Sequence, residues 1–221
     1  PLLIRKDFNP VLRLAITVPE NETLNLQSIK FSLTAEQPPD AVIDSIIESL
    51  QLFTTGKSVQ FSAESPICSS VSPTSTILVK TPLSLKPGLH HLWLATRIKS
   101  SASLNQKLTA TCVEILTKTG PLLLQEEPSA PSQRIGVALR QHNEAGVHTY
   151  RIPALATSKA GNLLCVYDMR RNEGRDLQED IDIGLARSTN GGQTWTDTQV
   201  IMDMGEYGGL PQSQNGCSDP G

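Results

Sequence analysis

Arg151 lies inside the short stretch YRIPAL, Tyr150 to Leu155, which otherwise has the apolar character of a buried strand. A guanidinium stays ionised at ordinary pH, and burying it without an anionic partner is costly. Arg151 must therefore either face solvent or meet a negatively charged group. A carboxylate would suit it well, because two parallel N–H donors of arginine match the two carboxylate oxygens.

Metal and redox chemistry find little support in the sequence. The cysteines match no zinc-ligand spacing and are interpreted as small buried apolar side chains: Cys68, Cys112, Cys165 and Cys217. A disulfide between Cys68 and Cys112 stays open, because spacing alone does not decide it. We expect no metal and no cofactor.

The composition is that of an ordinary globular protein. Hydrophobic residues make up 38% of the 221 residues, and the formal net charge is −3. Lysines and arginines are scattered, so no basic surface for a phosphate backbone is expected. No apolar run approaches the roughly 18 residues that a membrane-spanning segment needs. We therefore expect no nucleic acid partner and no membrane span.

Alternating apolar and polar residues predict an antiparallel β-sandwich in the first half of the chain. The segments with this period are residues 11–18, 28–35, 58–63, 75–81, 90–98 and 107–116. Prolines and glycines between them predict the turns. Residues 39–53 stay ambiguous, because valine and isoleucine recur there at a helical spacing but also suit strands.

A change of composition divides the chain into two predicted domains. The stretch EEPSAPSQ, residues 126–133, has no apolar face to bury and is predicted to be a linker. A sandwich is then expected over residues 1–125 and a second unit over residues 134–221. The alternative is a long loop inside one domain.

The second unit combines short strands with a tight turn. Strands are predicted over residues 135–139, 150–155, 162–170 and 180–188. The turn STNGGQTW, residues 188–195, follows them. Its glycines permit positive φ, Ser188 and Asn190 can bond nearby amides, and Trp195 can fold its ring over the turn. Several short strands closed by such a turn are typical of one β-propeller blade.

Two of these motifs resemble those of sialidases. STNGGQTW is similar to the Asp-box S-x-D-x-G-x-x-W, with Asn190 in place of the usual Asp, and YRIP is similar to the RIP motif that opens their catalytic domain. Residues 150–195 resemble bacterial sialidases, and the order of domains resembles those of the Bacteroides group. The resemblance implies an all-β protein, in which an N-terminal sandwich similar to a carbohydrate-binding module precedes the first blades of a six-bladed propeller.

The resemblance assigns two arginines to substrate binding. Arg151 matches the RIP arginine, which in the family is one of three that bind the carboxylate of sialic acid. Arg170 matches a second active-site arginine at the end of the next strand. Arg171 and Arg175 are the alternatives, ranked below Arg170 because the strand VYDMR ends at that residue.

The resemblance also assigns two carboxylates. Asp176 matches the loop Asp that acts as general acid and base in the family, with Asp180 and Asp182 as competing carboxylates on an alternating strand. Asp219 matches the Asp that enters the pocket from the second blade and contacts polar groups of the sugar. Asp219 also precedes a proline, and an Asp-Pro pair by itself starts turns.

The implied function is that of an exo-sialidase, which removes terminal α-linked sialic acid from glycoproteins, glycolipids and oligosaccharides with a retaining mechanism. The family's Tyr nucleophile and its activating Glu come from late blades and have no match here. The second unit has the length of about two blades. We therefore expect an N-terminal portion that is inactive without the rest of the catalytic domain, supplied by the same gene product or a second chain.

A non-catalytic glycan-binding module or Asp-box propeller is the alternative function. Few aromatic residues could stack on sugars, and packing in the core is their favoured use: Phe8, Phe31, Phe53, Phe61 and Trp93. The chain does not begin with Met, so a leader is expected to have been removed. With the resemblance, this implies a periplasmic, secreted or cell-surface bacterial protein.

Overall fold

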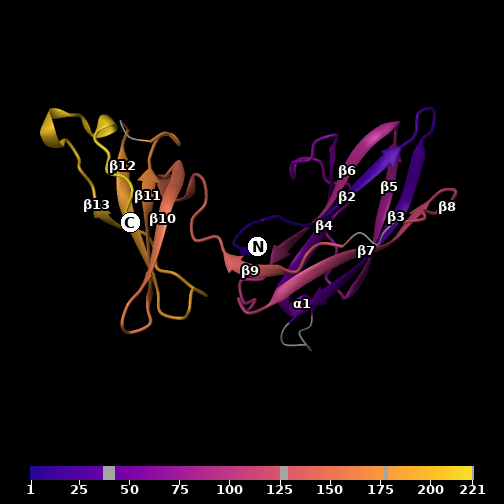
Figure 1. Ribbon diagram of the computed structural model, residues 1–221, viewed down its shortest axis with the longest axis horizontal. Coiled ribbons are helices and arrows are strands. Elements are labelled where there is room, and N and C mark those ends of the chain that lie inside the picture. Colours follow the sequence, from indigo (N-terminus) through magenta and orange to yellow (C-terminus); the bar gives the residue numbers. More distant parts are fainter. Residues whose placement is uncertain (37–42, 125–128, 177–178, 221) are drawn as a thin grey trace. The chain divides into compact units, whose positions relative to one another are not determined.

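The computed structural model describes residues 1–36, 43–124, 129–176 and 179–220. They form two compact units, Pro1–Gly136 and Val137–Gly221 (Figure 1). Strands make up nearly all of the regular structure, which confirms the predicted all-β class. Within the described residues, no helix is long and apolar enough to cross a membrane.

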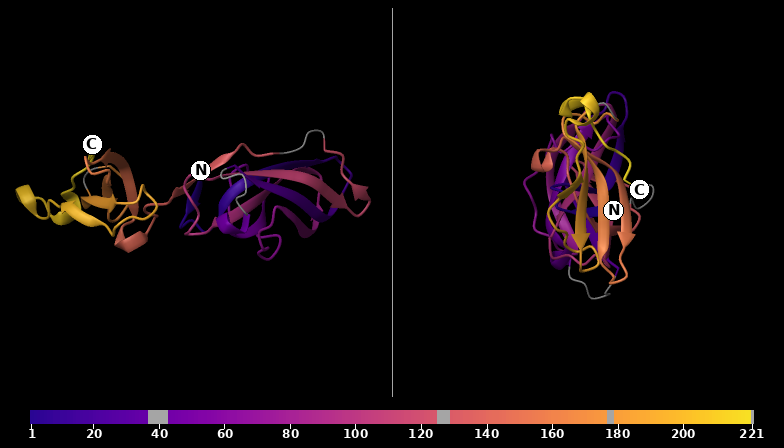
Figure 2. Two further views of the ribbon diagram at one scale, coloured as in Figure 1. Left: turned by 90° about the horizontal axis from the view of Figure 1, so that it is seen from below. Right: turned by 90° about the vertical axis from the view of Figure 1, so that its left-hand side faces the viewer.

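The described residues of the first unit form nine strands. They are β1 Leu2–Ile4, β2 Asn9–Val18, β3 Leu24–Ala35, β4 Ile47–Gly56, β5 Thr76–Leu85, β6 Gly88–Ile98, β7 Lys107–Thr117, β8 Gly120–Pro121 and β9 Gln133–Val137. One sheet has the order β1-β9-β7-β3-β5, with β8 paired to β7, and the other has the order β2-β6-β4. Figure 2 gives two further views of the strands. On β2, Leu14, Ile16 and Val18 are buried while the residues between them are exposed. Strands of this kind bury one face of each sheet.

Five of the six alternating segments predicted for this unit are strands, within β2, β3, β5, β6 and β7. The prediction over residues 58–63 is wrong, because that segment is irregular. Hydroxyl groups bond its backbone locally: Thr55 Oγ1 donates to the Ser58 carbonyl at 2.6 Å, and Gln60 N donates to Ser58 Oγ at 3.2 Å. Such local bonds compete with a strand ladder.

The ambiguous segment 39–53 contains a helical turn and a strand. Residues 39–42 lie outside the described residues, and helix α1, Ile43–Ile46, leads directly into β4. Ile43 and Ile46 are buried on the helical turn, and Leu50 and Leu52 are buried on the strand. The helical spacing therefore applies to residues 43–46, and the alternation of a strand applies from residue 47 onward.

The stretch predicted as a linker runs along β7 where the structure describes it. Ala130 N donates to the Ala110 carbonyl at 2.9 Å, and β9 pairs with β7 through Arg134 opposite Lys107. Residues 126–128 lie outside the described residues. The two compact units divide after Gly136, so residues 134–136, which were expected at the start of the second unit, lie in the first.

The second unit contains one antiparallel sheet with the order β10-β11-β12-β13 (Figure 1). The strands are β10 Thr149–Thr157, β11 Leu163–Arg170, β12 Ile181–Ser188 and β13 Gln199–Met202. The predicted strands 150–155, 162–170 and 180–188 are thus confirmed, whereas β13 was not expected. The described residues after β13 add only the short turns η2, Tyr207–Gly209, and η3, Gln212–Gln214.

The STNGGQTW turn closes β12 with the bonds that its residue types predicted. Gly191 and Gly192 have φ of 67° and 90°, and Gly192 N donates to Ser188 Oγ at 2.9 Å. Asn190 Oδ1 accepts the Thr194 N–H at 3.0 Å. The Trp195 ring packs against the core of the sheet, and its Nε1 donates to the Gly192 carbonyl at 2.9 Å. Asn190 therefore supplies the capping oxygen.

Replacing Asn190 should separate the role of this oxygen from that of the amide nitrogen. Asn190→Ala is expected to lower the free energy of unfolding by about 1 kcal/mol, because the Thr194 N–H loses its acceptor. Asn190→Asp is the matched variant. It keeps the oxygen and can accept from the Thr194 hydroxyl, which now accepts from Asn190 Nδ2 at 2.8 Å, so it should be at least as stable as wild type. Chemical denaturation of the full-length protein measures both, and equal losses would contradict the assignment.

Candidate functional site

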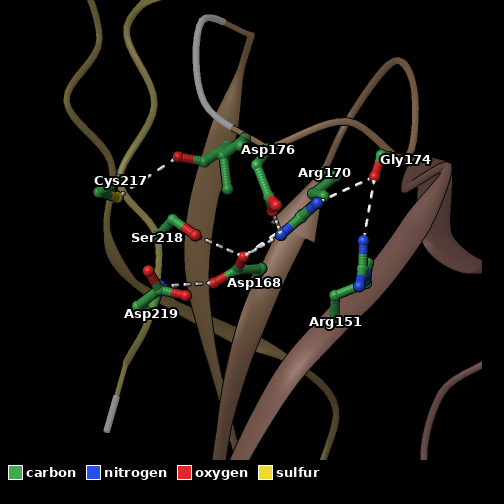
Figure 3. A network of polar contacts seen from close by, with 9 residues as sticks. Arg151, Asp168, Arg170, Gly174, Asp176, Cys217, Ser218 and Asp219 are labelled. Atoms are coloured by element: carbon green, nitrogen blue, oxygen red, sulfur yellow. Dashed lines mark hydrogen bonds and ion pairs between the residues drawn. The ribbon is translucent and has the colours of Figure 1, made fainter.

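The four predicted site residues come from four different parts of the second unit and lie close together (Figure 3). Arg151 is on β10 and Arg170 is the last residue of β11. Asp176 lies in the loop between β11 and β12, and Asp219 lies in the segment that follows η3. The structure thus brings together residues that are up to 68 positions apart in the chain.

Arg151 stands at a bulge in β10. It pairs with Asp168 across the sheet, but regular pairing resumes only at Ala154. Ile152 within the bulge has φ of 48°, which is an outlier for a β-branched residue. Bulges of this kind redirect side chains. Arg151 is exposed, and no carboxylate among the described residues lies within ion-pair distance of it.

Arg170 is completely buried, and its charge is compensated by carboxylates. Its Nε and Nη2 donate to Asp168 Oδ2 at 3.3 and 3.0 Å, and Nη2 also forms an ion pair with Asp176. Its Nη1 donates to the Gly174 carbonyl at 2.9 Å. Burial lowers the pKa of Arg170, but the hydrogen bonds and charges of Asp168 and Asp176 outweigh this effect, so the pKa lies above its ordinary value.

The Gly174 carbonyl brings the two arginines together. Arg151 Nη1 donates to the same oxygen as Arg170 Nη1, at 3.5 Å (Figure 3). The bonds of Arg170 use four of its five N–H donors, which leaves one Nη1 hydrogen, whereas most donors of Arg151 face solvent. An anionic ligand at this position would therefore meet mainly Arg151, with Arg170 beside it.

Asp176 is an exposed carboxylate on a loop that is fastened at its base. Its side chain is 69% exposed and contacts only the buried Arg170 among the described ion pairs. At the base of the loop, Arg171 N donates to the Asp180 carbonyl at 3.0 Å. Inside it, Glu173 N donates to the buried Glu179 Oε2 at 3.1 Å. Residues 177–178 lie outside the described residues.

The competing residues of this loop have other partners. Arg171 Nε donates to Asp182 Oδ2 at 2.9 Å, and Asp182 is almost completely buried. Arg175 forms a surface ion pair with Glu173 at 3.3 Å. Among these three arginines, Arg170 is the one that shares the Gly174 carbonyl with Arg151.

Asp219 arrives on a segment that is fastened to β12 and β11. Cys217 N donates to the Ile181 carbonyl at 2.9 Å, in the manner of one more strand pairing. Ser218 Oγ then donates to Asp168 Oδ2 at 2.7 Å, and Asp219 N donates to Asp168 Oδ1 at 3.1 Å. Asp219 itself is exposed and has φ of 61°, a conformation that Asp tolerates better than most residues.

Asp168 is the residue of this site that the sequence reasoning missed. Its side chain is 0% exposed, and it accepts bonds from Arg170, Ser218 and Asp219. A signal was present, because Asp168 and Arg170 are two positions apart on a strand and therefore lie on the same face. Opposite charges with this spacing on a buried strand indicate an ion pair.

No metal or disulfide chemistry is added by the described residues. They contain no group of three or more His, Cys, Asp or Glu side chains that could hold a metal ion. Cys68 and Cys112 are not bridged to each other in this structure. Cys112 and Cys165 are buried among apolar side chains.

The chain is similar to sialidases over its whole length. The family of the N-terminal domain of BNR-repeat neuraminidase matches residues 1–120. A sialidase of Bacteroides fragilis, strain YCH46, is 32% identical over 240 residues, which cover 100% of this chain and 44% of that protein. A sialidase of Micromonospora viridifaciens is 37% identical over 94 residues, which cover 42% of this chain and 13% of that protein.

A solved structure, the Hadza microbial sialidase Hz136, matches with a TM-score of 0.80 and 26% sequence identity. The match covers 98% of this chain and 45% of that protein. The chain therefore spans less than half the length of the Bacteroides fragilis sialidase and of Hz136, and it corresponds to an N-terminal portion.

Gly216 is predicted to be essential for the approach of the C-terminal segment. A Cβ at this position would lie 2.6 Å from the Glu179 carbonyl oxygen and 2.9 Å from Ile181 Cβ. Gly216→Ala is therefore expected to lower the free energy of unfolding by about 1–3 kcal/mol or to displace the segment. Ser213→Ala, at an exposed position nearby, is the control. Thermal unfolding of the full-length protein measures both, and equal stability of the two variants would refute the close approach.

Asp180 is predicted to make stability depend on pH. Burial, followed by the charge of Asp182, raises the pKa of Asp180 above its ordinary value. The folded protein then holds this proton more tightly than the unfolded chain, so stability is lost as pH rises from about 4 through the raised pKa. Asp180→Asn should raise Tm at pH 7 and lose this advantage below about pH 4. Asp197→Asn, at an exposed acid, is the control, and a gain that persists in acid would contradict the mechanism.

Proposed function

This chain belongs to the BNR-repeat neuraminidase family, and we propose that the protein of which it is an N-terminal portion is an exo-sialidase. Its substrate would be terminal α-linked sialic acid on glycoproteins, glycolipids and oligosaccharides. The observation that carries the proposal is the exposed Arg151 guanidinium, which lacks a carboxylate partner among the described residues and lies beside a second arginine. An anionic sugar supplies the missing partner.

The acid group of sialic acid sits on the anomeric carbon, so the cation that binds it also positions the bond to be broken. Arg151 offers the larger number of available N–H donors, because the side chain of Arg170 is completely buried and pairs with carboxylates. A ligand carboxylate would gain charge-assisted hydrogen bonds from Arg151 at little cost, because that guanidinium is already solvent-facing, and Arg170 would lie beside it as the second arginine of the site.

Asp176 would act as the general acid and base of the reaction. A carboxylate in an ion pair has no proton to give, so Asp176 must separate from Arg170 before it can protonate a leaving group. The incoming sugar carboxylate adds a negative charge beside Asp176, which repels the Asp176 carboxylate and weakens its ion pair with Arg170. Asp219, exposed on the neighbouring segment, would contact polar groups of the sugar.

The remaining chemistry would come from the rest of the protein. In the proposed enzyme, later blades of a six-bladed propeller supply a Tyr nucleophile, its activating Glu and further arginines, and the reaction proceeds with retention. The first unit would serve as a sandwich similar to a carbohydrate-binding module, and the protein would act in the periplasm, at the cell surface or outside the cell. This reaction needs no cofactor.

Turnover of a fluorogenic α-sialoside by the full-length protein tests the proposal. Arg151→Ala should lower kcat/KM by about 100-fold or more, mainly through KM, because the substrate carboxylate loses its principal partner. Asp176→Ala should lower kcat by about 100-fold or more. Arg187→Ala, at an exposed arginine on β12, is the control and should retain full activity.

Two results would contradict these assignments. Unchanged turnover in both Arg151→Ala and Asp176→Ala would remove the site from this position. Saturable binding of a sialylated glycan without turnover by the wild-type full-length protein would instead indicate a non-catalytic glycan-binding protein.

A further inference from the structure

Asp168 connects two parts of the site that are distant in the chain. It lies on β11, whereas Ser218 and Asp219 come from the end of the described chain, about 50 positions later. No other carboxylate among the described residues is completely buried and bonded to both segments. Figure 3 shows Asp168 between Arg170 on one side and the Ser218–Asp219 segment on the other.

The two oxygens of Asp168 have different partners. Oδ2 accepts from Arg170 and from the Ser218 hydroxyl, at 3.0 and 2.7 Å. Oδ1 accepts the Asp219 backbone N–H at 3.1 Å. The Asp168 carboxylate therefore orients the Arg170 guanidinium. It also fixes the backbone of Asp219, and with it the starting point of the Asp219 side chain.

We propose that Asp168 is a positioning residue, which couples the geometry of Arg170 to that of the Ser218–Asp219 segment. The proposal rests on the sialidase function proposed above. Asp168 would not touch the substrate, because it is enclosed by its own partners. It would act through Arg170, which holds Asp176, and through Asp219, which faces solvent beside them.

The coupling follows from the cost of burying charge. A fully buried carboxylate needs its donors, and it becomes under-bonded if either segment moves away. The segment has its own anchors, since Cys217 N bonds the Ile181 carbonyl and Asn215 Nδ2 bonds the Gly205 carbonyl at 2.8 Å. Asp168 therefore fixes the positions of Ser218 and Asp219, whereas other bonds hold the earlier part of the segment.

Kinetics of the full-length enzyme on the fluorogenic α-sialoside test the proposal. Asp168→Asn keeps the shape but removes the negative charge that pairs with Arg170 and replaces one oxygen with an NH₂ donor. Either the acceptor for Arg170 and Ser218 or the acceptor for the Asp219 amide is then lost. Because misplacement by about 1 Å can cost about 100-fold in rate, we expect kcat/KM to fall by about that factor, with changes in both KM and kcat. Asp203→Asn, in an exposed turn of the same unit, is the matched control and should be unchanged.

Ser218→Ala is a second variant that leaves the buried ion pair intact. It removes one hydrogen bond to Asp168 and should lower kcat/KM by about 3–10-fold without a matching loss of Tm. This variant keeps the proposal testable if Asp168→Asn does not fold. In the double variant, the two losses should not multiply, because Ser218 acts through Asp168.

Three outcomes decide the proposal. Values of kcat and KM within about 2-fold of wild type for Asp168→Asn or for Ser218→Ala would overturn it, as would losses that multiply in the double variant. If the wild-type protein does not cleave the sialoside, the proposed sialidase function is wrong, and these kinetics do not test the role of Asp168.

Hydrogen exchange at the Asp219 amide then tests the coupling between Asp168 and the Ser218–Asp219 segment. Unchanged protection of this amide in Ser218→Ala would overturn the coupling.

Discussion

The buried ion pair between Asp168 and Arg170 is the contact on which the rest of the site depends. Taking both charges out of water is expensive, and their attraction offsets this cost only when the remaining donors and acceptors are satisfied. Here the other partners are Gly174, Asp176, Ser218 and the Asp219 amide. Satisfying the pair therefore draws the loop after β11 and the C-terminal segment to one place.

The two arginines differ in burial and in the compensation of their charge. Arg170 is enclosed by carboxylates and serves mainly to organise the protein around it, whereas Arg151 presents its charge to solvent from a bulge in β10. The shared Gly174 carbonyl keeps the free charge beside the compensated one. In the proposed enzyme, Arg151 would then attract the substrate carboxylate without first breaking a protein ion pair.

Much of the fold and some of the site followed from local pattern. Alternation predicted most strands, and the Ser188 and glycine positions predicted the turn that orients Trp195. Alternation failed over residues 58–63, where hydroxyl groups close local turns, and β13 lacked a pattern long enough to be recognised. The described residues of the expected linker, 129–133, border β7, because extended backbone N–H and C=O groups can pair at a sheet edge.

The sequence by itself determined the strands, the glycine turn and the presence of an arginine where an apolar run begins, since each depends on neighbours within a few positions. Only the tertiary structure decided which charges meet. Asp168 is bonded to residues about 50 positions later in the chain. The path of the backbone brings Ser218 and Asp219 to it, and the residue type of Asp168 alone could not predict this. The sequence does not show which of several Asp residues pairs with an arginine. In the folded protein, the burial of each carboxylate and its distance from the cations decide this.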